Sequence, residues 1–218
     1  MDPKYIIAKR VALEIKPRTL VNLGIGLPTL VATYVRKDVL IAFQSENGIV
    51  GMGVRPPEGM ETLDLTDAGG GYVTALPGAT SLDSATSFGF IRGGHLDVTV
   101  LGGLQVDTQG RLANWMVPGK MVPGMGGAMD LVTGARRVIV AMTHTAKGEP
   151  KIVETCTLPL TSVRPVSLII TELAVIEPSP DGLILRETAP GVSTSQVVAA
   201  TGCHLIVPAS VPDMPLAA

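Results

Sequence analysis

The chain has 218 residues, with 17 Lys and Arg against 19 Asp and Glu, so it carries no excess positive charge for nucleic acid. Hydrophobic residues make up 46% and charged residues 17%, which excludes a disordered chain and indicates a substantial core. With only one Trp, three Tyr and three Phe, the chain also lacks the stacking platforms of single-strand binders.

The first predicted element is a helix. Asp2 is suited to cap it, Pro3 fits its first turn, and apolar residues recur at helical spacing until Pro17. Charged residues at positions 9, 10 and 14 interrupt this apolar stretch, so we expect no export signal and a cytoplasmic protein. No uncharged apolar run reaches the roughly 18 residues of a membrane span.

Continuous apolar runs predict strands at 19–23, 39–43, 98–101, 137–142 and 168–175. Between them the pattern favours helices at 28–35, 81–90 and 128–133. Strands that are apolar throughout are covered on both faces, so we predict an α/β fold: a layered, mostly parallel sheet with helices on both faces. Shorter runs at 183–187 and 205–207 are compatible with an antiparallel edge.

We expect one domain over residues 1–218. The segment 51–71 holds two prolines and six glycines and is interpreted as a long surface loop rather than a linker. From about residue 208 a Pro/Ala-rich tail follows, expected to be frayed or to contact a partner. Two cysteines without a C-x-x-C spacing and only three histidines make a zinc site unexpected.

Glu46 is the leading candidate for chemistry. It lies in Gln-Ser-Glu-Asn-Gly, directly after a buried strand, where open α/β sheets bind their ligands. Glycines at 48, 51 and 53 would let a ligand approach the backbone. The alternative is a solvated turn glutamate, because matches this short also arise by chance.

A second candidate is the glycine run at Gly124, Gly126, Gly127 and Ala128, which opens a predicted helix. Bare backbone amides at such a point can stabilise an anion or a developing oxyanion, although a tight turn explains the glycines equally well. Asn22, before another glycine pair, is a ligand contact or an ordinary turn residue. The chain has neither a complete dinucleotide fingerprint nor a P-loop.

Several blocks in the same order resemble the β subunit of family I CoA-transferases along nearly the whole chain. They are Val-Asn-Leu-Gly-Ile-Gly-Leu-Pro-Thr at 21–29, Gln-Ser-Glu-Asn-Gly at 44–48, Ile-Arg-Gly-Gly-His at 91–95, Leu-Ala-Asn-Trp at 112–115, and the glycine- and methionine-rich segment 118–132. The resemblance is strongest to the branch of acetate or butyrate acetoacetate CoA-transferases, which belong to the 3-oxoacid CoA-transferases.

This resemblance implies a fold like that of CoA-transferases and sugar-phosphate isomerases, and it gives the candidates roles. Glu46 would be the nucleophile, the residues from Gly124 to Ala128 would form the oxyanion and CoA site, and Asn22 would line the active site. Coenzyme A would be a substrate, no cofactor would be permanently bound, and an α subunit would complete an α2β2 or larger assembly.

The residues fit a ping-pong exchange through an acyl-glutamyl anhydride and a glutamyl-CoA thioester, which needs no nucleoside triphosphate. Two alternatives remain open from the sequence. The first is an isomerase or deaminase of the same fold with Glu46 as general base, and the second is a ligand-sensing module without catalysis.

Overall fold

The computed structural model describes residues 1–38, 40–119 and 124–218. Its main sheet contains β1 (Leu20–Leu23), β2 (Ala42–Ser45), β3 (Ile49–Met52), β4 (Ala75–Ser81), β5 (Val98–Leu101), β8 (Arg137–Ala141), β12 (Leu168–Ile170), β13 (Ala174–Ser179), β14 (Gly182–Thr188) and β15 (Leu205–Ile206). Smaller pairings join β6 (Gln105–Asp107), β7 (Leu112–Ala113) and β11 (Ile152–Val153), and β9 (Thr145–Ala146) with β10 (Glu149–Pro150). The helices are α1 (Pro3–Ala12), the 3-10 turn η1 (Leu27–Leu30), α2 (Val31–Tyr34), α3 (Ser84–Arg92), α4 (Ala128–Gly134) and α5 (Thr194–Ala200).

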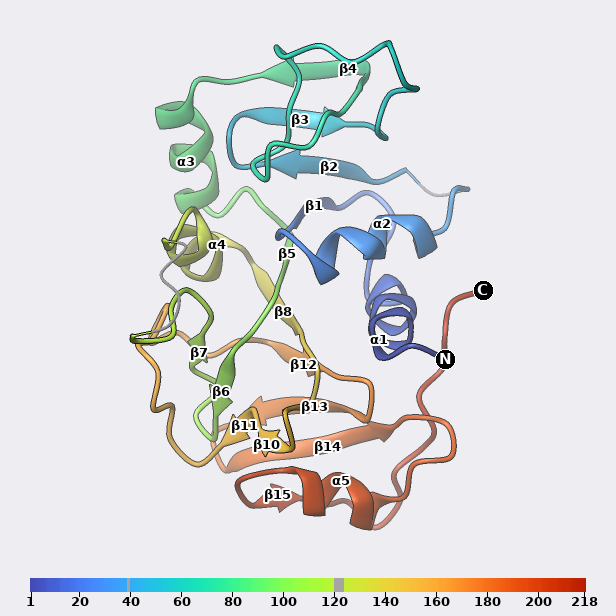
Figure 1. The fold of residues 1–218 in the computed structure, drawn as a ribbon, viewed down its shortest axis with the longest axis vertical. Coiled ribbons are helices and arrows are strands. Elements are labelled where there is room, and N and C mark those ends of the chain that lie inside the picture. The colour runs from blue at the N-terminus through green and yellow to red at the C-terminus, as the bar shows by residue number, and fades with distance from the viewer. Residues whose placement is uncertain (39, 120–123) are drawn as a thin grey trace.

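The main sheet runs in the order β15-β14-β13-β12-β8-β5-β1-β2-β3-β4 (Figure 1). Its five central neighbours, β12, β8, β5, β1 and β2, are all parallel. Antiparallel strands extend the sheet on both sides, through β13 and β14 and through β3 and β4. The chain starts the parallel set at β1, adds β2 on one side and then crosses to β5 on the other, so β1 marks the point where the strand order reverses.

Helices cover both faces of this sheet, as the apolar strands predicted (Figure 1). One hydrophobic cluster joins α1 and α2 to one face, and includes Ile7, Val11, Val31 and Val100. A second cluster joins α3, α4 and α5 to the opposite face. The predicted α/β class with a mostly parallel centre is therefore confirmed, and the sheet is built from strands buried on both sides.

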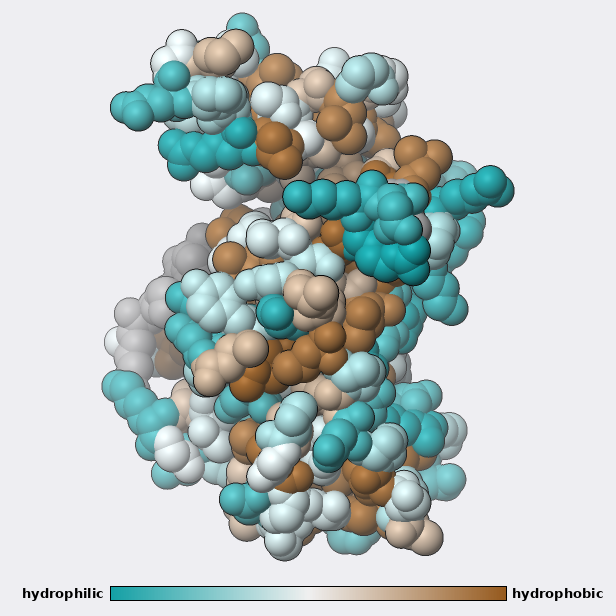
Figure 2. All heavy atoms as spheres, turned by 90° about the vertical axis from the view of Figure 1, so that its right-hand side faces the viewer, coloured by the Kyte–Doolittle hydropathy of each residue, from teal (hydrophilic) through white to brown (hydrophobic). Residues whose placement is uncertain are grey.

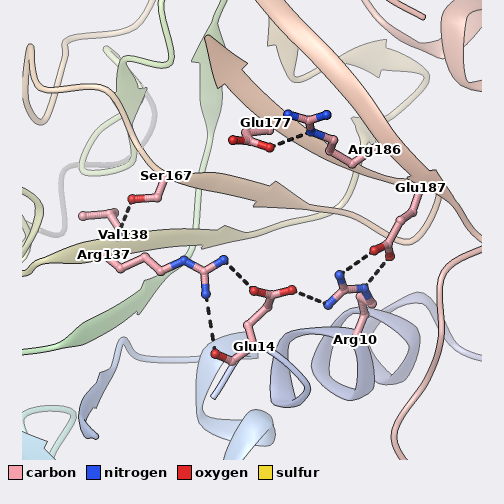
Figure 3. Close-up of polar contacts among 8 residues, drawn as sticks. All are labelled: Arg10, Glu14, Arg137, Val138, Ser167, Glu177, Arg186 and Glu187. Carbon is pink, nitrogen blue, oxygen red and sulfur yellow. Dashed lines mark hydrogen bonds and ion pairs between the residues drawn. The ribbon is translucent and has the colours of Figure 1, made fainter. Parts of the chain in front are cut away.

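Helix α1 starts as the sequence predicted. The Asp2 side chain accepts a hydrogen bond from the Lys4 amide at 3.0 Å, and Pro3 occupies the first turn. Its far end is joined to the sheet by ion pairs (Figure 3): Arg10, only 5% exposed, bonds Glu187 of β14 and Glu14, and Glu14 in turn bonds Arg137 of β8. These contacts fix α1 against strands far away in the sequence.

Several local expectations were wrong, each for a physical reason. The apolar run 168–175 is divided into β12 and β13 by a turn at Thr171, whose hydroxyl accepts from the Leu173 and Ala174 amides. Periodicity does not detect such a turn, because both sides of it are equally apolar. Residues 28–35 form a 3-10 turn and one short helical turn rather than a single helix.

The two edges of the sheet also differ from expectation. Strand β3 takes in residues 51 and 52. Strand β4 was not predicted, because its sequence ALPGATS contains Pro and Gly and has only one β-branched residue, and the strand is mostly exposed. At the other edge β14 is antiparallel to β13, but β15 is parallel to β14. The tail after residue 208 is packed rather than frayed: Met214 is 2% exposed and contributes to the α1 cluster.

Within residues 1–38, 40–119 and 124–218, no helix combines the length and the apolar character that crossing a bilayer requires. Within the same ranges, no group of three or more His, Cys, Asp or Glu side chains is placed to hold a metal ion.

Candidate active site

The register of the central strands aligns three polar side chains. Asn22 of β1 lies opposite Gln44 of β2 on one side and opposite Thr99 of β5 on the other. Asn22 and Thr99 are fully buried and Gln44 is 1% exposed, inside strands that are largely apolar. This row lies where the strand order reverses, which is the place where open α/β sheets bind ligands beyond the carboxyl ends of their strands.

Glu46 follows the end of β2 and lies above this row, half-buried. The Asn22 amide Nδ2 donates to its carboxylate Oε2 at 3.1 Å. A single Asn side chain from the neighbouring strand therefore holds the carboxylate at the carboxyl edge of the sheet. Oε2 of Glu46 accepts this hydrogen bond, and the carboxylate forms no ion pair among the described residues. The other oxygen, Oε1, is therefore available as a nucleophile.

Gly127 lies directly against the carboxylate. A Cβ atom added at this position would be 3.0 Å from Glu46 Cγ, 3.3 Å from Glu46 Oε1 and 3.3 Å from a ring carbon of Phe88. The glycine is needed here for close approach, because any side chain would meet the catalytic candidate. The structure thus brings Glu46, Asn22 and Gly127 into one site from three separate segments.

The glycine loop before α4 presents bare backbone. Gly124 and Gly126 have positive φ angles of 93° and 52°, and neither would meet a neighbour within 4 Å if it carried a Cβ. The Ala128 amide donates to the Met125 carbonyl at 3.2 Å, whereas the Gly126 and Gly127 amides meet no acceptor within the described ranges. Residues 120–123 of the motif that precedes this loop lie outside the described residues.

A set of buried hydrogen bonds supports the site from below. The Thr99 hydroxyl donates to Asn22 Oδ1 at 3.3 Å, and Asn22 Nδ2 also donates to Gln44 Oε1 at 3.0 Å. Gln44 Nε2 in turn donates to the Ser45 carbonyl at 3.0 Å and to the Ser87 hydroxyl of α3 at 3.3 Å. No buried side-chain nitrogen or oxygen in the described part of the chain lacks a partner.

Sequence reasoning missed Gln44, Thr99 and Ser87. The available signal was a polar residue within a short apolar strand, as in Leu-Val-Asn-Leu at 20–23 and Val-Thr-Val-Leu at 98–101. Such a residue must find a hydrogen-bond partner when buried, but the sequence does not say which one.

A cavity of about 780 Å³ opens beside Glu46. Its wall is mostly apolar, with Leu23, Phe43, Met52 and Val73 among the lining residues. Two further charged side chains line it, Arg55 and Asp67, and the Asp67 carboxylate is already occupied by the Gly69 and Gly71 amides at 2.8 Å. A largely apolar cavity with a few converging polar groups is typical of a small-molecule site.

The rim of the cavity is apolar and open. Ile25 is 68% exposed, Val54 79% and Leu76 46%, and all three also line the cavity. In Figure 2 the upper end of the molecule, where β2, β3 and β4 lie, shows hydrophobic residues among polar ones. Apolar side chains gathered in this way commonly mark a surface that another molecule covers.

Comparison with known proteins shows the family to which this chain belongs. The sequence profile of the family described as Coenzyme A transferase matches residues 4–200. The chain is 53% identical over 210 residues to the beta subunit of the acetate CoA-transferase of Escherichia coli (strain K12), covering 96% of each chain. It is also 53% identical over 192 residues to the B subunit of the succinyl-CoA:3-ketoacid coenzyme A transferase of Helicobacter pylori (strain ATCC 700392 / 26695), covering 88% of this chain and 92% of that protein.

Among solved structures, the acyl-CoA transferase YdiF of E. coli O157:H7, described as a thioester complex with CoA, superposes with a TM-score of 0.78 at 22% identity. The match covers 99% of this chain, which spans only 43% of the YdiF chain. At this identity the likeness concerns the fold, and it confirms the predicted CoA-transferase fold.

Proposed function

Since the chain belongs to the coenzyme A transferase family, we propose that its Glu46 is the nucleophile of the transfer and carries CoA as a glutamyl thioester. The chain is a β subunit of such an enzyme, moving CoA between carboxylic acids. The observation that carries the proposal is the position of Glu46. It lies between the Asn22 amide and the Gly127 backbone, at the edge of an apolar cavity.

The reaction begins with attack of the Glu46 carboxylate oxygen on the carbonyl carbon of the acyl-CoA thioester. The C–S bond then breaks, which leaves an acyl-glutamyl anhydride and free CoA thiolate. The thiolate attacks the glutamyl carbonyl of the anhydride and expels the first carboxylate, so Glu46 now carries CoA as a thioester. A second carboxylic acid reverses these steps, and no redox partner or nucleoside triphosphate is consumed.

Attack on the thioester places negative charge on its oxygen. We assign stabilisation of this charge to the Gly126 and Gly127 amides, because the Ala128 amide is already bonded to Met125. Loss of one such donor typically costs about 10²-fold to 10³-fold in turnover. Gly124, exposed and with a left-handed backbone, would let CoA approach this loop closely.

The proposed substrates are a short-chain acyl-CoA or acetoacetyl-CoA and an acid such as acetate, butyrate or acetoacetate. The relatives named for acetate and 3-ketoacid transfer support this class, as does the mostly apolar cavity. Coenzyme A enters as a substrate, and the proposal includes no permanently bound cofactor. The proposed location is the cytoplasm.

We further propose that an α subunit completes the active enzyme, in an α2β2 or larger assembly. Two relatives that this chain matches over more than 90% of their length are named as β or B subunits. The YdiF chain is longer, and this chain matches only 43% of it. The exposed apolar rim formed by Ile25, Val54 and Leu76 is a suitable surface for such a partner.

The test replaces Glu46 by Gln, which keeps the shape of the side chain but removes its anionic oxygen. In the complex with its α subunit, the Glu46 peptide of the wild-type chain should gain the mass of CoA less one water after mixing with acetoacetyl-CoA. We expect E46Q to lose the adduct and about 10³-fold or more of the turnover, while still binding its partner.

Glu58 provides a matched control, because it is an exposed carboxylate on the loop after β3. E58Q should form the adduct at the wild-type rate. Turnover retained by E46Q, or exchange without any acyl-enzyme, would refute the assignment of the nucleophile.

A further inference from the structure

We propose that Thr99 is a positioning residue for the reaction, acting on Glu46 through the Asn22 amide. The inference rests on the proposed function, since it assumes that Glu46 is the nucleophile. Thr99 touches neither Glu46 nor the cavity, so its effect depends on the orientation of one intermediate side chain.

The sheet register places the three groups in a line. Asn22 is the direct neighbour of Thr99 across the β1–β5 pair, although the two residues are 77 positions apart in the chain. On its other side Asn22 faces Gln44 and reaches up to Glu46. Because Asn22 and Thr99 are both fully buried, no water from bulk solvent replaces a missing donor or acceptor.

An Asn amide has two ends of nearly the same shape and opposite hydrogen-bonding character. Its Nδ2 end faces three acceptors, namely Gln44 Oε1 at 3.0 Å, Glu46 Oε2 at 3.1 Å and the Gln44 backbone carbonyl at 3.2 Å. Its Oδ1 end faces the Thr99 hydroxyl, which is a donor. A flipped amide would place Oδ1 against the Glu46 carboxylate, where two acceptors repel.

Gln44 fixes the opposite end of this row. Its Nε2 donates to the Ser45 carbonyl and to the Ser87 hydroxyl, so its Oε1 is left to face Asn22. The Asn22 amide is therefore oriented from both sides, by the side-chain and backbone acceptors of Gln44 and by the hydroxyl donor of Thr99. Removal of the donor leaves Oδ1 buried without a partner and weakens the hold on Glu46.

The expected effect is moderate. At 3.3 Å, the bond from Thr99 to Asn22 is long for a hydroxyl donor. We therefore expect T99V, which keeps the size of the side chain but removes its donor, to slow formation of the CoA adduct about fivefold to tenfold. The KM for the acyl-CoA should change little, because Thr99 does not line the cavity.

The measurement is the single-turnover rate of adduct formation on the Glu46 peptide in the complex with the α subunit, after mixing with acetoacetyl-CoA. T99S keeps the hydroxyl and should restore the rate to within about twofold of wild type. T99S and T99A form a second pair that differs only in the hydroxyl, and this pair decides the question if T99V does not fold.

Thr161 offers a matched control. It is 2% exposed, and its hydroxyl donates to Asn114 Oδ1 at 2.6 Å, the same type of bond outside the lining of the cavity. T161V should lower stability at least as much as T99V but leave the rate of adduct formation unchanged.

A double-mutant cycle separates positioning from general destabilisation. In an N22A background Thr99 has no amide to orient, so T99V should cause no further slowing. Equal slowing in both backgrounds, a wild-type rate in T99V, or a change in KM alone would overturn the inference. If E46Q still formed the adduct in the same assay, the proposed function itself would fail instead.

Discussion

Acidification should destabilise this protein through one buried histidine, His144. Its side chain is fully buried, with Nδ1 3.0 Å from the Thr171 hydroxyl and Nε2 2.9 Å from the Thr201 hydroxyl. Burial, with a smaller contribution from the positive charge of Lys151, lowers the pKa of His144 from 6.5 to about 4. The folded protein therefore keeps this imidazole neutral at a pH where the unfolded chain takes up a proton.

The sign and size follow from this difference. Because the folded pKa lies below the unfolded one, the stabilising contribution is complete above about pH 6.5 and is lost as the pH falls toward 4. The full difference corresponds to about 3 kcal/mol, of which about 2 kcal/mol should be lost between about pH 8 and pH 5. Other groups titrate in the same range, so the comparison needs a variant that lacks only this one.

Urea unfolding of wild type and H144Q at both pH values isolates the histidine. Gln can bond both threonine hydroxyls but does not titrate, so H144Q should be less stable than wild type at about pH 8. Its free energy of unfolding should fall by about 2 kcal/mol less than that of wild type on going to about pH 5. Parallel pH dependence of the two proteins would refute the explanation.

Two further predictions concern the site and the attachment of α1. G127A should lower turnover tenfold or more with little loss of stability, because its methyl group would displace the Glu46 side chain. The control G89A should keep full activity, because a Cβ at position 89 would have no neighbour within 4 Å. Equal turnover of the two variants would contradict the packing argument. E14Q should lower the free energy of unfolding, measured in urea, by about 3 kcal/mol, because it removes the charge that pairs with two arginines, one of them buried. The control E177Q should lower it by less than about 1 kcal/mol, because its ion pair is half-exposed. Equal losses in the two variants would refute this explanation.

The sequence alone determined the elements whose signals are local. Asp2 and Pro3 specify the start of α1, and the apolar runs specify the central strands with their covering helices. The same local logic placed Glu46 at the end of a buried strand, followed by glycine. These features depend on backbone geometry and hydrophobic burial within a few residues, so they can be predicted from neighbours in the chain.

Only the tertiary structure decided which distant residues meet. Thr99 faces Asn22 because β1 and β5 pair in one register, and Arg10 reaches Glu187 across 177 positions because α1 packs on the sheet. Gly127 lies against Glu46 only after α4 has packed beside α3. Hydrophobic periodicity gives the face of an element that is buried but not its partner, because the partner is selected by the packing of the whole sheet and its helices.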